Sequence, residues 1–401
     1  MPGLLSVALS DRKPGRIRPS LDRLTEALQL LGNPQGTFSS ALIVGTNGKG
    51  STAAMLERIL SAGGVKTGLA TSPHLVRVNE RIRVDGCEIG DKSLTEILKK
   101  LEAFPDLTFF ETLTAASFLH FAESGVEVAV LEAGMGGRWD ASRAAGSTVA
   151  GLTNVGTDHR SWLGDQPEAI ADDKGAALFA AEMAVFGPQV DPWVQDRLAP
   201  SGARAAAASV EVRPNPTRGT LVARWFGSGW TELKVPLAGE HQRANLHLAM
   251  AMAESCREMG WIDLLEPARV FKALDSVRWV GRLSPTTVAG RPVLLDGAHN
   301  LEAAESLAAF LKDQPVLYNL VFACLDDKPV RKMADILRPV VGEVAVCSVE
   351  DPRSMAVEVL LEAFPGALAC SNPVDAVMRL SDPVLAVGSL RLVGALLDTG
   401  G

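Results

Sequence analysis

The chain has 401 residues, of which 47% are hydrophobic and 21% are charged, so it can bury a sizeable core and is not a disordered chain. Its length suggests about two to three domains. The formal net charge is −8 at pH 7 and there is no run of basic residues, which argues against nucleic acid or an anionic membrane as a partner.

Five scattered cysteines, never spaced as C-x-x-C, favour free thiols in a reducing compartment over a disulfide framework or a zinc site. Residues 1–18 contain basic side chains but no apolar core segment, so no signal peptide is predicted. No apolar run reaches the roughly 20 residues that span a bilayer. We therefore expect a cytoplasmic protein.

Apolar periodicity predicts alternating helices and strands in the first part of the chain. An amphipathic helix is expected over 20–31, with Ser20 as its N-cap and Gly32 just past its end. Strands are then expected at 41–44, 65–70, 126–132 and 149–154, and helices after Gly48 and at 93–104 and 109–123. This alternation is typical of an α/β fold with a parallel, doubly wound sheet. In such sheets, ligands bind beyond the carboxyl ends of the strands.

The second part of the chain begins with a different pattern. Residues 210–236 suggest short strands in a hairpin insertion or edge, and 240–259 form a strong helical pattern. Gly, Pro and Thr cluster at 281–291, after which the alternation restarts. Strands are expected at 292–295, 316–322, 343–347 and 384–387, and helices at 301–312, 333–337 and 356–363. We therefore predict an N-terminal domain over 1–283 and a smaller C-terminal α/β domain over 284–401.

A glycine-rich segment, G-T-N-G-K-G-S-T at 45–52, joins a predicted strand to a predicted helix. Backbone N–H groups and a helix N-terminus cradle phosphates in this geometry. Lys49 would neutralise the outer phosphates, and Ser51 or Thr52 would reach them or a bound metal. The spacing departs from G-x-x-x-x-G-K-[ST], because the glycines are closer and Gly50 separates the lysine from the hydroxyl. We interpret the segment as an ATP-binding loop; the alternative is an ordinary glycine-rich turn.

Ser72, Glu132 and His159 each follow a predicted strand of this sheet. Two oxygens and a nitrogen around a phosphate loop suit Mg²⁺ with several retained waters. Taken alone, Glu132 would be a helix N-cap or surface carboxylate and His159 a hydrogen-bonded loop histidine, but their convergence favours the metal. Lys174, in A-D-D-K-G, is by its own residues equally well explained as a lysine on a helix surface.

Several motifs, in order along the chain, carry a family resemblance. They are G-T-N-G-K-G-S-T, T-S-P-H-L at 71–75, L-E-A-G-M-G-G-R-W-D-A-S at 131–142, H-Q-x-x-N at 241–245 and L-D-G-A-H-N at 295–300. Together they resemble the folylpolyglutamate synthase/dihydrofolate synthase family of the Mur ligase superfamily, from about residue 20 to residues 388–390. The resemblance implies a P-loop ATPase-type sheet in the first domain and a Rossmann-like second domain. It also implies a ligase that uses ATP and Mg²⁺ to add L-glutamate to dihydropteroate, forming dihydrofolate, and to reduced folates. We expect the protein to be a monomer.

The resemblance also implies roles for single residues. Its ATP-binding positions are Thr46, Asn47, Gly48, Lys49, Gly50, Ser51, Asn245, Arg282, Asp296 and His299. Its metal ligands are Ser72, Glu132, His159 and a carbamylated Lys174, and Lys49, His159 and Lys174 would be catalytic. Its pterin-binding positions are Thr108, Phe109, Phe110, Glu111, Trp139, Asp140 and Ala141. The family pattern is broken at Arg143, where Asn is usual, and at 279–282, which read W-V-G-R rather than W-P-G-R.

Within the pterin-binding positions, the Asp140 carboxylate is suited to accept two hydrogen bonds from an amino-pyrimidinone edge. The phenylalanines would supply apolar or stacking walls. The alternatives are an N-cap for the segment that starts at Ala141 and plain core packing for Phe109 and Phe110.

Three other functions are alternatives to this interpretation. A cell-wall Mur ligase would carry a further N-terminal domain, and only about 40 residues precede Gly45, fewer than a domain needs. A regulatory or scaffold protein with a degenerate nucleotide site is disfavoured by intact Lys49, Glu132, His159 and Asp296. A folylpolyglutamate synthase without dihydrofolate synthase activity remains the open alternative within the enzyme interpretation.

Overall fold

The computed structural model describes residues 18–156, 166–208, 210–214, 221–224, 231–233, 237–263 and 266–398. The chain divides into two compact units. Unit 1 comprises Met1–His74, Val78–Pro236 and Gln242–Val277, and unit 2 comprises Leu75–Arg77, Leu237–His241 and Arg278–Gly401. The domain boundary predicted between residues 283 and 284 stays a prediction. Of the helices in the described ranges, none is sufficiently long and apolar to cross a membrane.

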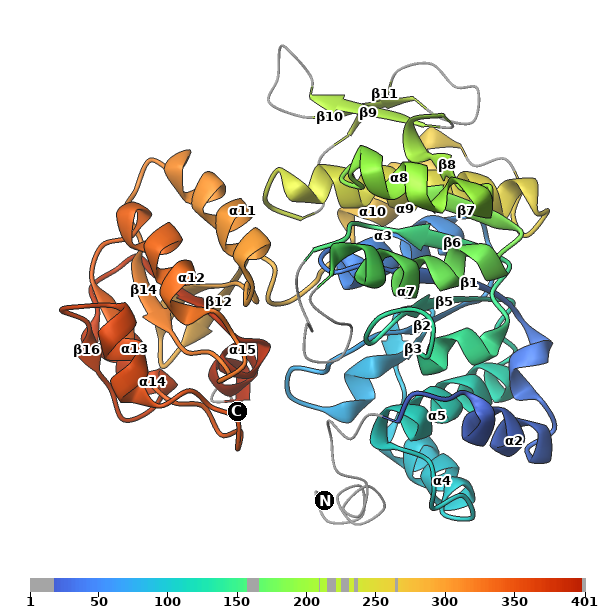
Figure 1. Cartoon of the computed structure of the whole chain (residues 1–401), viewed down its shortest axis with the longest axis horizontal. Coiled ribbons are helices and arrows are strands. Elements are labelled where there is room, and N and C mark those ends of the chain that lie inside the picture. The colour runs from blue at the N-terminus through green and yellow to red at the C-terminus, as the bar shows by residue number, and fades with distance from the viewer. Residues whose placement is uncertain are drawn as a thin grey trace. The chain divides into compact units, whose positions relative to one another are not determined.

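Unit 1 is built on an eight-stranded sheet with the strand order β4-β3-β2-β5-β1-β6-β7-β8 (Figure 1). The neighbouring strands β2, β5, β1, β6, β7 and β8 pair in parallel. At the other edge, β3 runs antiparallel to β2, and β4 runs antiparallel to β3. Their bounds are β1 Ser39–Val44, β2 Thr67–Ala70, β3 Ile82–Val84, β4 Cys87–Glu88, β5 Val128–Glu132, β6 Val149–Leu152, β7 Met183–Phe186 and β8 Arg204–Ala205. The predicted parallel, doubly wound sheet is confirmed, and the antiparallel edge is an addition to it.

Helices cover both faces of this sheet (Figure 1). One face carries α2 Asp22–Leu30, α5 Phe109–Ser124 and α7 Pro167–Ala180, with α4 Asp91–Leu101 and α8 Pro192–Leu198 packed beside them. The other carries α3 Lys49–Ala62, α9 His241–Glu258 and α10 Pro267–Asp275. Gly151 of β6 lets α9 approach closely, because a Cβ there would lie 2.3 Å from the sulfur of Met252.

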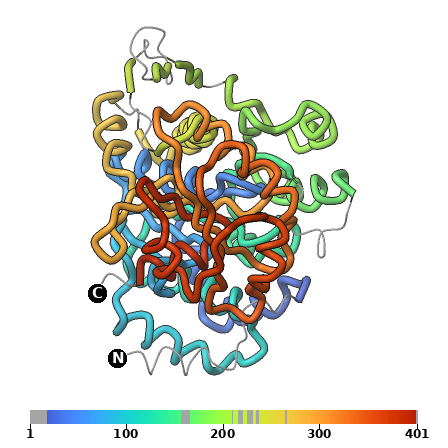
Figure 2. Tube along the Cα trace, turned by 90° about the vertical axis from the view of Figure 1, so that its left-hand side faces the viewer, coloured from blue at the N-terminus to red at the C-terminus, as the bar shows by residue number. Residues whose placement is uncertain are grey.

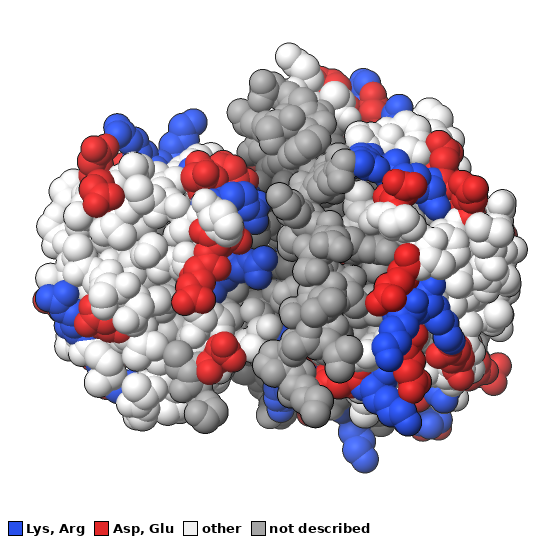
Figure 3. All heavy atoms as spheres, turned by 90° about the horizontal axis from the view of Figure 1, so that it is seen from below, with Lys and Arg blue, Asp and Glu red and all other residues white. Residues whose placement is uncertain are grey.

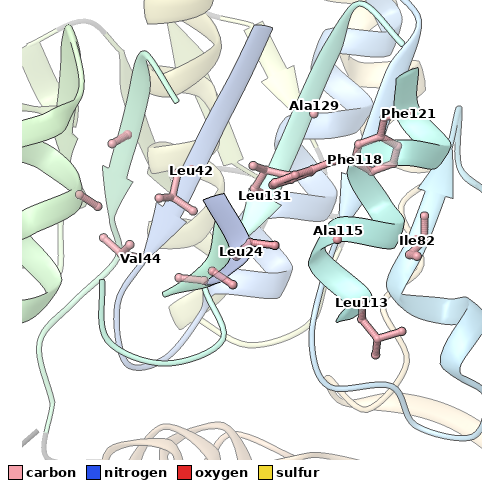
Figure 4. Packing of buried hydrophobic residues seen from close by; sticks show 14 of the residues in the cluster. Leu24, Leu42, Val44, Ile82, Leu113, Ala115, Phe118, Phe121, Ala129 and Leu131 are labelled. Atoms are coloured by element: carbon pink, nitrogen blue, oxygen red, sulfur yellow. The ribbon is translucent and has the colours of Figure 1, made fainter. Parts of the chain in front are cut away.

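The apolar run of β1 is buried on both faces, as a central parallel strand requires. Leu42 and Val44 belong to the core under α5, while the alternate residue Ile43 is buried on the opposite side. Figure 4 shows Leu42 beside Leu131 of β5, with Phe118 and Phe121 of α5 in the same cluster. Each fully buried side chain of this size contributes roughly 1.5–3 kcal/mol.

A small antiparallel sheet is inserted before α9. Its order is β11-β10-β9, with β9 Glu211–Pro214, β10 Leu221–Arg224 and β11 Thr231–Leu233. The predicted short strands are therefore confirmed. The ring of His247, on α9, makes a 2.5 Å hydrogen bond to the carbonyl of Val210 just before β9. Burial lowers the pKa of His247, and this hydrogen bond opposes the shift.

Unit 2 contains a six-stranded sheet in the order β12-β13-β17-β14-β15-β16, drawn in orange to red in Figure 2. Only β12 among these described strands runs antiparallel to its neighbour. The strands are β12 Ser284–Val288, β13 Arg291–Leu295, β14 Asn319–Phe322, β15 Val344–Val346, β16 Leu368–Ala369 and β17 Val384–Val387. The helices are α11 Leu301–Lys312, α12 Val330–Leu337, α13 Val357–Ala363, α14 Pro373–Arg379 and α15 Leu390–Leu397. The second, smaller α/β fold is confirmed.

The predicted N-cap of the first helix is wrong by one residue. α2 begins at Asp22 with Leu21 as its N-cap, and no side chain caps it there. Ser20 lies one position earlier, and its hydroxyl accepts the Asp22 N–H at 3.0 Å. The serine thus satisfies a first-turn N–H from outside the helix.

Acidic and basic side chains are mixed on the face shown in Figure 3, and the described residues drawn there form no extended area of one sign. This agrees with the mixed composition of the sequence. The expected lack of a nucleic-acid partner stays a prediction.

Candidate functional site

The carboxyl edge of the unit 1 sheet brings together residues that are far apart in the sequence. β1 lies between β5 and β6, with Ile43 opposite Glu132 and Val44 opposite Leu152. Because all three strands are parallel, their carboxyl ends meet at one edge, where ligands bind in such sheets. The glycine-rich loop follows β1 at this edge.

Two glycines let the loop pass close to its neighbours. Gly45 has φ +144°, and a Cβ there would lie 1.9 Å from Thr153 Oγ1. Gly48, the N-cap of α3, has φ +83°, and its Cβ would lie 2.2 Å from Asn245 Oδ1. Asn245 is buried and donates from Nδ2 to Gln242 Oε1 at 2.9 Å. The predicted nucleotide residue Asn245 is therefore in contact with the loop.

Asn154, which the sequence analysis did not single out, lies just after β6 and holds the glycine-rich loop in place. Its Oδ1 accepts the N–H groups of Asn47 at 3.0 Å and Thr46 at 3.3 Å. The hydroxyl of Thr46 in turn accepts the Gly156 N–H at 2.8 Å. The signal that could have identified Asn154 is its position two residues after the buried end of β6, at the ligand edge.

Lys49 and Ser51 give the loop its polar chemistry. The ammonium of Lys49 donates to the carbonyls of Gly45 and Thr46, both at 3.1 Å, so its charge lies on the loop. Ser51 is 1% exposed, and its hydroxyl has no hydrogen-bond partner among the described residues. An unpaired buried hydroxyl costs about 1–3 kcal/mol, which a ligand oxygen or a metal would offset. The loop thus fits a bound nucleotide and its metal ion.

The structure brings two of the predicted metal ligands together. The N–H of Ser72 donates to Glu132 Oε2 at 3.0 Å, which places the serine beside the carboxylate at the end of β5. Glu132 is 8% exposed and is not a helix N-cap. The third, His159, lies outside the described residues. Within the described ranges there is no group of three or more His, Cys, Asp or Glu side chains that could hold a metal.

Lys174 is not on the helix surface, so that interpretation is wrong. It is 2% exposed on α7, and its Nζ donates to the Gly45 carbonyl at 2.9 Å. A buried ammonium requires such a partner because desolvation of the charge is costly. The residue before it, Asp173, accepts the Gly137 N–H at 2.8 Å, and Asp172 forms an ion pair with Arg197. Local sequence could not show this, since two neighbouring aspartates suggest exposure.

The predicted pterin positions at the start of α5 stabilise that helix. Thr108 is its N-cap, and Thr108 and Glu111 exchange hydrogen bonds in a capping box. Glu111 also forms an ion pair with Arg23 at 2.8 Å. Phe109 is half-buried, and the guanidinium of Arg81 lies over its ring, 5.4 Å from the ring centroid. Phe109 thus has a cationic neighbour in addition to core packing.

The loop after β5 holds the other predicted pterin positions. Trp139 is 52% exposed, whereas Asp140 and Ala141 are buried. Asp140 caps the 3-10 helix Ala141–Ala145: its oxygens accept the N–H groups of Ser142 at 2.9 Å and Met135 at 3.0 Å. Burial raises the pKa of Asp140, and these hydrogen bonds oppose the shift. The N-cap alternative is therefore observed, and a direct pterin contact stays a prediction.

The departure at Arg143 has a structural explanation. Its guanidinium Nη1 donates to the carbonyl of Arg138 at 2.6 Å, across the same loop. The arginine thus closes the loop that carries Trp139 and Asp140. A shorter side chain at this position would have to close it by another contact.

Unit 2 brings Arg282, Asp296 and His299 into one pair of adjoining loops. Asp296 accepts the N–H groups of Leu283 and Ala298, both at 2.9 Å. Arg282 donates to the Gly281 carbonyl at 2.8 Å. A hydrogen bond of 2.7 Å joins His299 Nδ1 to the Gly297 carbonyl, which holds the ring against its own loop. Burial also lowers the pKa of His241 in this unit, and the charge of Asp296 opposes that shift.

Comparisons with known families match nearly all of this architecture. The Mur ligase middle domain matches residues 43–253, and the Mur ligase glutamate ligase domain matches residues 281–393. The first match spans the phosphate loop, Glu132, Lys174 and Asn245. The second spans Arg282, Asp296 and His299.

Individual proteins give the same result. The dihydrofolate synthase/folylpolyglutamate synthase of Mycobacterium tuberculosis is 34% identical over 378 residues, covering 86% of this chain and 77% of that protein. A folylpolyglutamate synthase structure from that organism, complexed with ADP and AMPPCP, aligns with a TM-score of 0.86 at 31% identity, covering 99% of this chain and 98% of its own. The bifunctional folylpolyglutamate synthase/dihydrofolate synthase of Yersinia pestis, complexed with AMPPNP and a Mn ion, aligns with a TM-score of 0.85 at 26% identity, covering 98% and 97%.

Proposed function

We propose, because the chain belongs to the dihydrofolate synthase/folylpolyglutamate synthase family of the Mur ligases, that it is an ATP-dependent ligase of folate metabolism. It adds L-glutamate to dihydropteroate, forming dihydrofolate, and adds further glutamates to reduced folates. The observation that carries this proposal is the loop at 45–51, closed against Asn245 and containing the unpartnered buried hydroxyl of Ser51. The catalytic and binding roles of the single residues below are part of the proposal.

The reaction must activate a carboxylate, which is a poor electrophile. A carboxylate oxygen of the acceptor attacks the γ-phosphorus of ATP, ADP leaves, and an acyl phosphate forms. The amine of glutamate then attacks the acyl carbon, inorganic phosphate leaves, and the amine loses a proton. Such transfers depend on positioning and charge neutralisation more than on a protein nucleophile. Lys49 and the loop N–H groups supply this here.

Ser72, Glu132 and Lys174 would hold the divalent metal, together with His159. A bound Mg²⁺ neutralises charge on phosphate oxygens. For Lys174 to act as an anion, its amine must add CO₂ and release a proton; the carbamate nitrogen keeps one N–H, which can still donate to the Gly45 carbonyl. The family resemblance supports this carbamylation, and the burial of Lys174 at the loop supports a role in the site.

The acceptor would bind between the loop after β5 and the start of α5. Gly134 of that loop lies against the Phe110 ring, where a Cβ would be 2.6 Å from the ring carbon. Trp139 offers an exposed aromatic face and Phe109 lies under the Arg81 guanidinium. Aromatic surfaces of this kind suit a planar pterin.

The test is a side-by-side assay of purified enzyme with ATP, Mg²⁺ and labelled glutamate, and with dihydropteroate or tetrahydrofolate as acceptor. We expect glutamate addition to both, with product masses that confirm one new amide bond. Activity with tetrahydrofolate alone would leave the narrower folylpolyglutamate synthase function. Activity with neither acceptor would refute the proposal.

Three further properties complete it. The protein is a monomer in this proposal. It acts in the cytoplasm, which agrees with its five free thiols, of which Cys87 is exposed and the others are buried. It has no nucleic-acid partner, which agrees with the absence of any run of basic residues in the sequence. Size-exclusion chromatography with light scattering tests the monomer. Expression of residues 284–401 alone tests the predicted domain boundary, since a correctly delimited domain folds cooperatively.

A further inference from the structure

The loop that follows β5 is attached to α7 through backbone-to-backbone packing. A Cβ on Gly137 would lie 2.7 Å from the carbonyl oxygen of Lys174 and 2.8 Å from that of Asp173. No side chain fits at that position without a shift of one of the two elements. The loop therefore rests directly on the helix at these two residues.

A carboxylate fixes this contact. Asp173 Oδ1 accepts the N–H of Gly137 at 2.8 Å and that of Arg138 at 3.4 Å. Two consecutive backbone N–H groups thus point at one oxygen, an arrangement that favours an anion. The next residue in the chain, Trp139, begins the predicted pterin-binding segment. Asp173 thereby sets the position from which that segment starts.

The adjacent residue of α7 makes the corresponding contact with the phosphate loop. Lys174 Nζ donates to the Gly45 carbonyl at 2.9 Å. Consecutive residues of a helix point about 100° apart, so one turn of α7 can reach two different loops. The loop at 134–141 and the phosphate loop at 45–51 are therefore both hydrogen-bonded to the same turn of α7.

We infer that Asp173 is a positioning residue for the acceptor substrate: it holds the loop 134–141 at a fixed distance from the phosphate loop. This rests on the proposed function. The acceptor carboxylate must approach the γ-phosphate in line, and a misplacement of about 1 Å can cost on the order of a hundredfold in rate. Asp173 touches no reacting atom in this assignment, and acts through the loop.

Asp172 provides a matched control. It is the same residue type on the same helix turn, but its carboxylate is 41% exposed and pairs with Arg197 rather than with the loop. Asp173→Ala should raise the KM for dihydropteroate about tenfold or more and lower kcat, with little change in the KM for ATP. Asp173→Asn keeps an oxygen that accepts both N–H groups, so it should restore most of the lost activity. Asp172→Ala should behave as wild type.

Hydrogen exchange gives a readout that does not depend on catalysis. The amides of Gly137 and Arg138 should exchange faster in Asp173→Ala than in wild type. Their exchange rates in Asp172→Ala should equal those of wild type. An unaltered KM for dihydropteroate in Asp173→Ala, or equal losses in Asp173→Ala and Asp173→Asn, would overturn the inference. So would an equal rise in both KM values, which indicates general destabilisation.

If Asp173→Ala does not fold, Gly137→Ala decides, because its added methyl group displaces the loop and should give the same KM split; an unchanged KM would refute the inference. If the wild-type enzyme uses neither acceptor, the proposed function fails. The exchange of the Gly137 and Arg138 amides then still tests whether Asp173 holds the loop.

Discussion

Gly48→Ala is the most informative single perturbation of the phosphate loop. At φ +83° the new side chain adopts a left-handed backbone conformation, which costs about 1–2 kcal/mol for an L-residue. Its Cβ would also lie 2.2 Å from Asn245 Oδ1, so the amide must move. That movement breaks the buried hydrogen bond to Gln242, which adds about 1–3 kcal/mol. We expect a total loss of about 2–5 kcal/mol in the free energy of unfolding.

Gly64→Ala is the control for the backbone part of this cost. Gly64 follows the same helix at its other end, has φ +85°, and has nothing within 4 Å of a built Cβ. Its substitution should cost only the conformational part, about 1–2 kcal/mol. The difference between the two variants therefore isolates the contact with Asn245.

The assay is urea unfolding of both variants followed by circular dichroism, together with titration of a fluorescent ATP analogue. Gly48→Ala should be the less stable variant and should bind the nucleotide more weakly, whereas Gly64→Ala should bind it as wild type does. Equal losses of unfolding free energy and equal nucleotide affinities would show that the contact between Gly48 and Asn245 has no energetic role.

Four further outcomes are expected. Lys49→Ala should fold normally but lose ligase turnover, because its charge-assisted contacts strengthen as negative charge develops on the phosphates; near-normal turnover in a folded variant would contradict the assignment. Glu132→Gln should raise the Mg²⁺ concentration for half-maximal activity by about tenfold or more, since the ligand loses its charge, and excess Mg²⁺ should partly restore activity in a metal titration. Lys174→Ala should be inactive and partly rescued by acetate or formate; a plain ammonium at Lys174 in crystals grown with bicarbonate and ATP would argue against carbamylation. Burial lowers the pKa of His247, so the folded protein resists a proton that the unfolded chain binds, and the free energy of unfolding should fall as the pH drops below 6.5; His247→Gln should weaken this dependence in urea titrations, and an unchanged slope would contradict it.

Local patterns predicted the elements whose own residues decide their structure. The four apolar residues before Gly45 and the helical pattern after Gly48 correspond to β1 and α3, and the predicted helix over 301–312 matches α11 in full. Strong periodicity and glycine punctuation are local signals, so no tertiary contact was needed to identify them. The ends of the weaker elements differ from the prediction by one to three residues, as at the start of β14 and at the end of α4.

Tertiary contacts decided what local patterns could not. Lys174 follows two aspartates, a local pattern typical of an exposed helix surface. It is buried nevertheless, and the Gly45 carbonyl, far away in the sequence, accepts a hydrogen bond from its ammonium. Asn154 likewise acquires its role only when β6 lies beside β1. The sequence allowed two roles for Asp140, a pterin-binding carboxylate or an N-cap. Its hydrogen-bond donors, the N–H groups of Met135 and Ser142, lie within a few residues of it along the chain, so the sequence around Asp140 looks the same for both roles.

The strand order of unit 1 has a consequence for synthesis on the ribosome. β1 leaves the ribosome well before β5 and β6, the two strands that pair with its edges. At about 5–20 residues per second, its apolar segment waits on the order of 5–20 s for both partners. During that interval it is an unpaired hydrophobic strand, which other nascent chains can join and chaperones bind. A transcript truncated before Val149 would release a chain in which the phosphate loop has neither its second neighbouring strand nor Asn154, so it would yield an aggregation-prone fragment rather than a smaller nucleotide-binding domain.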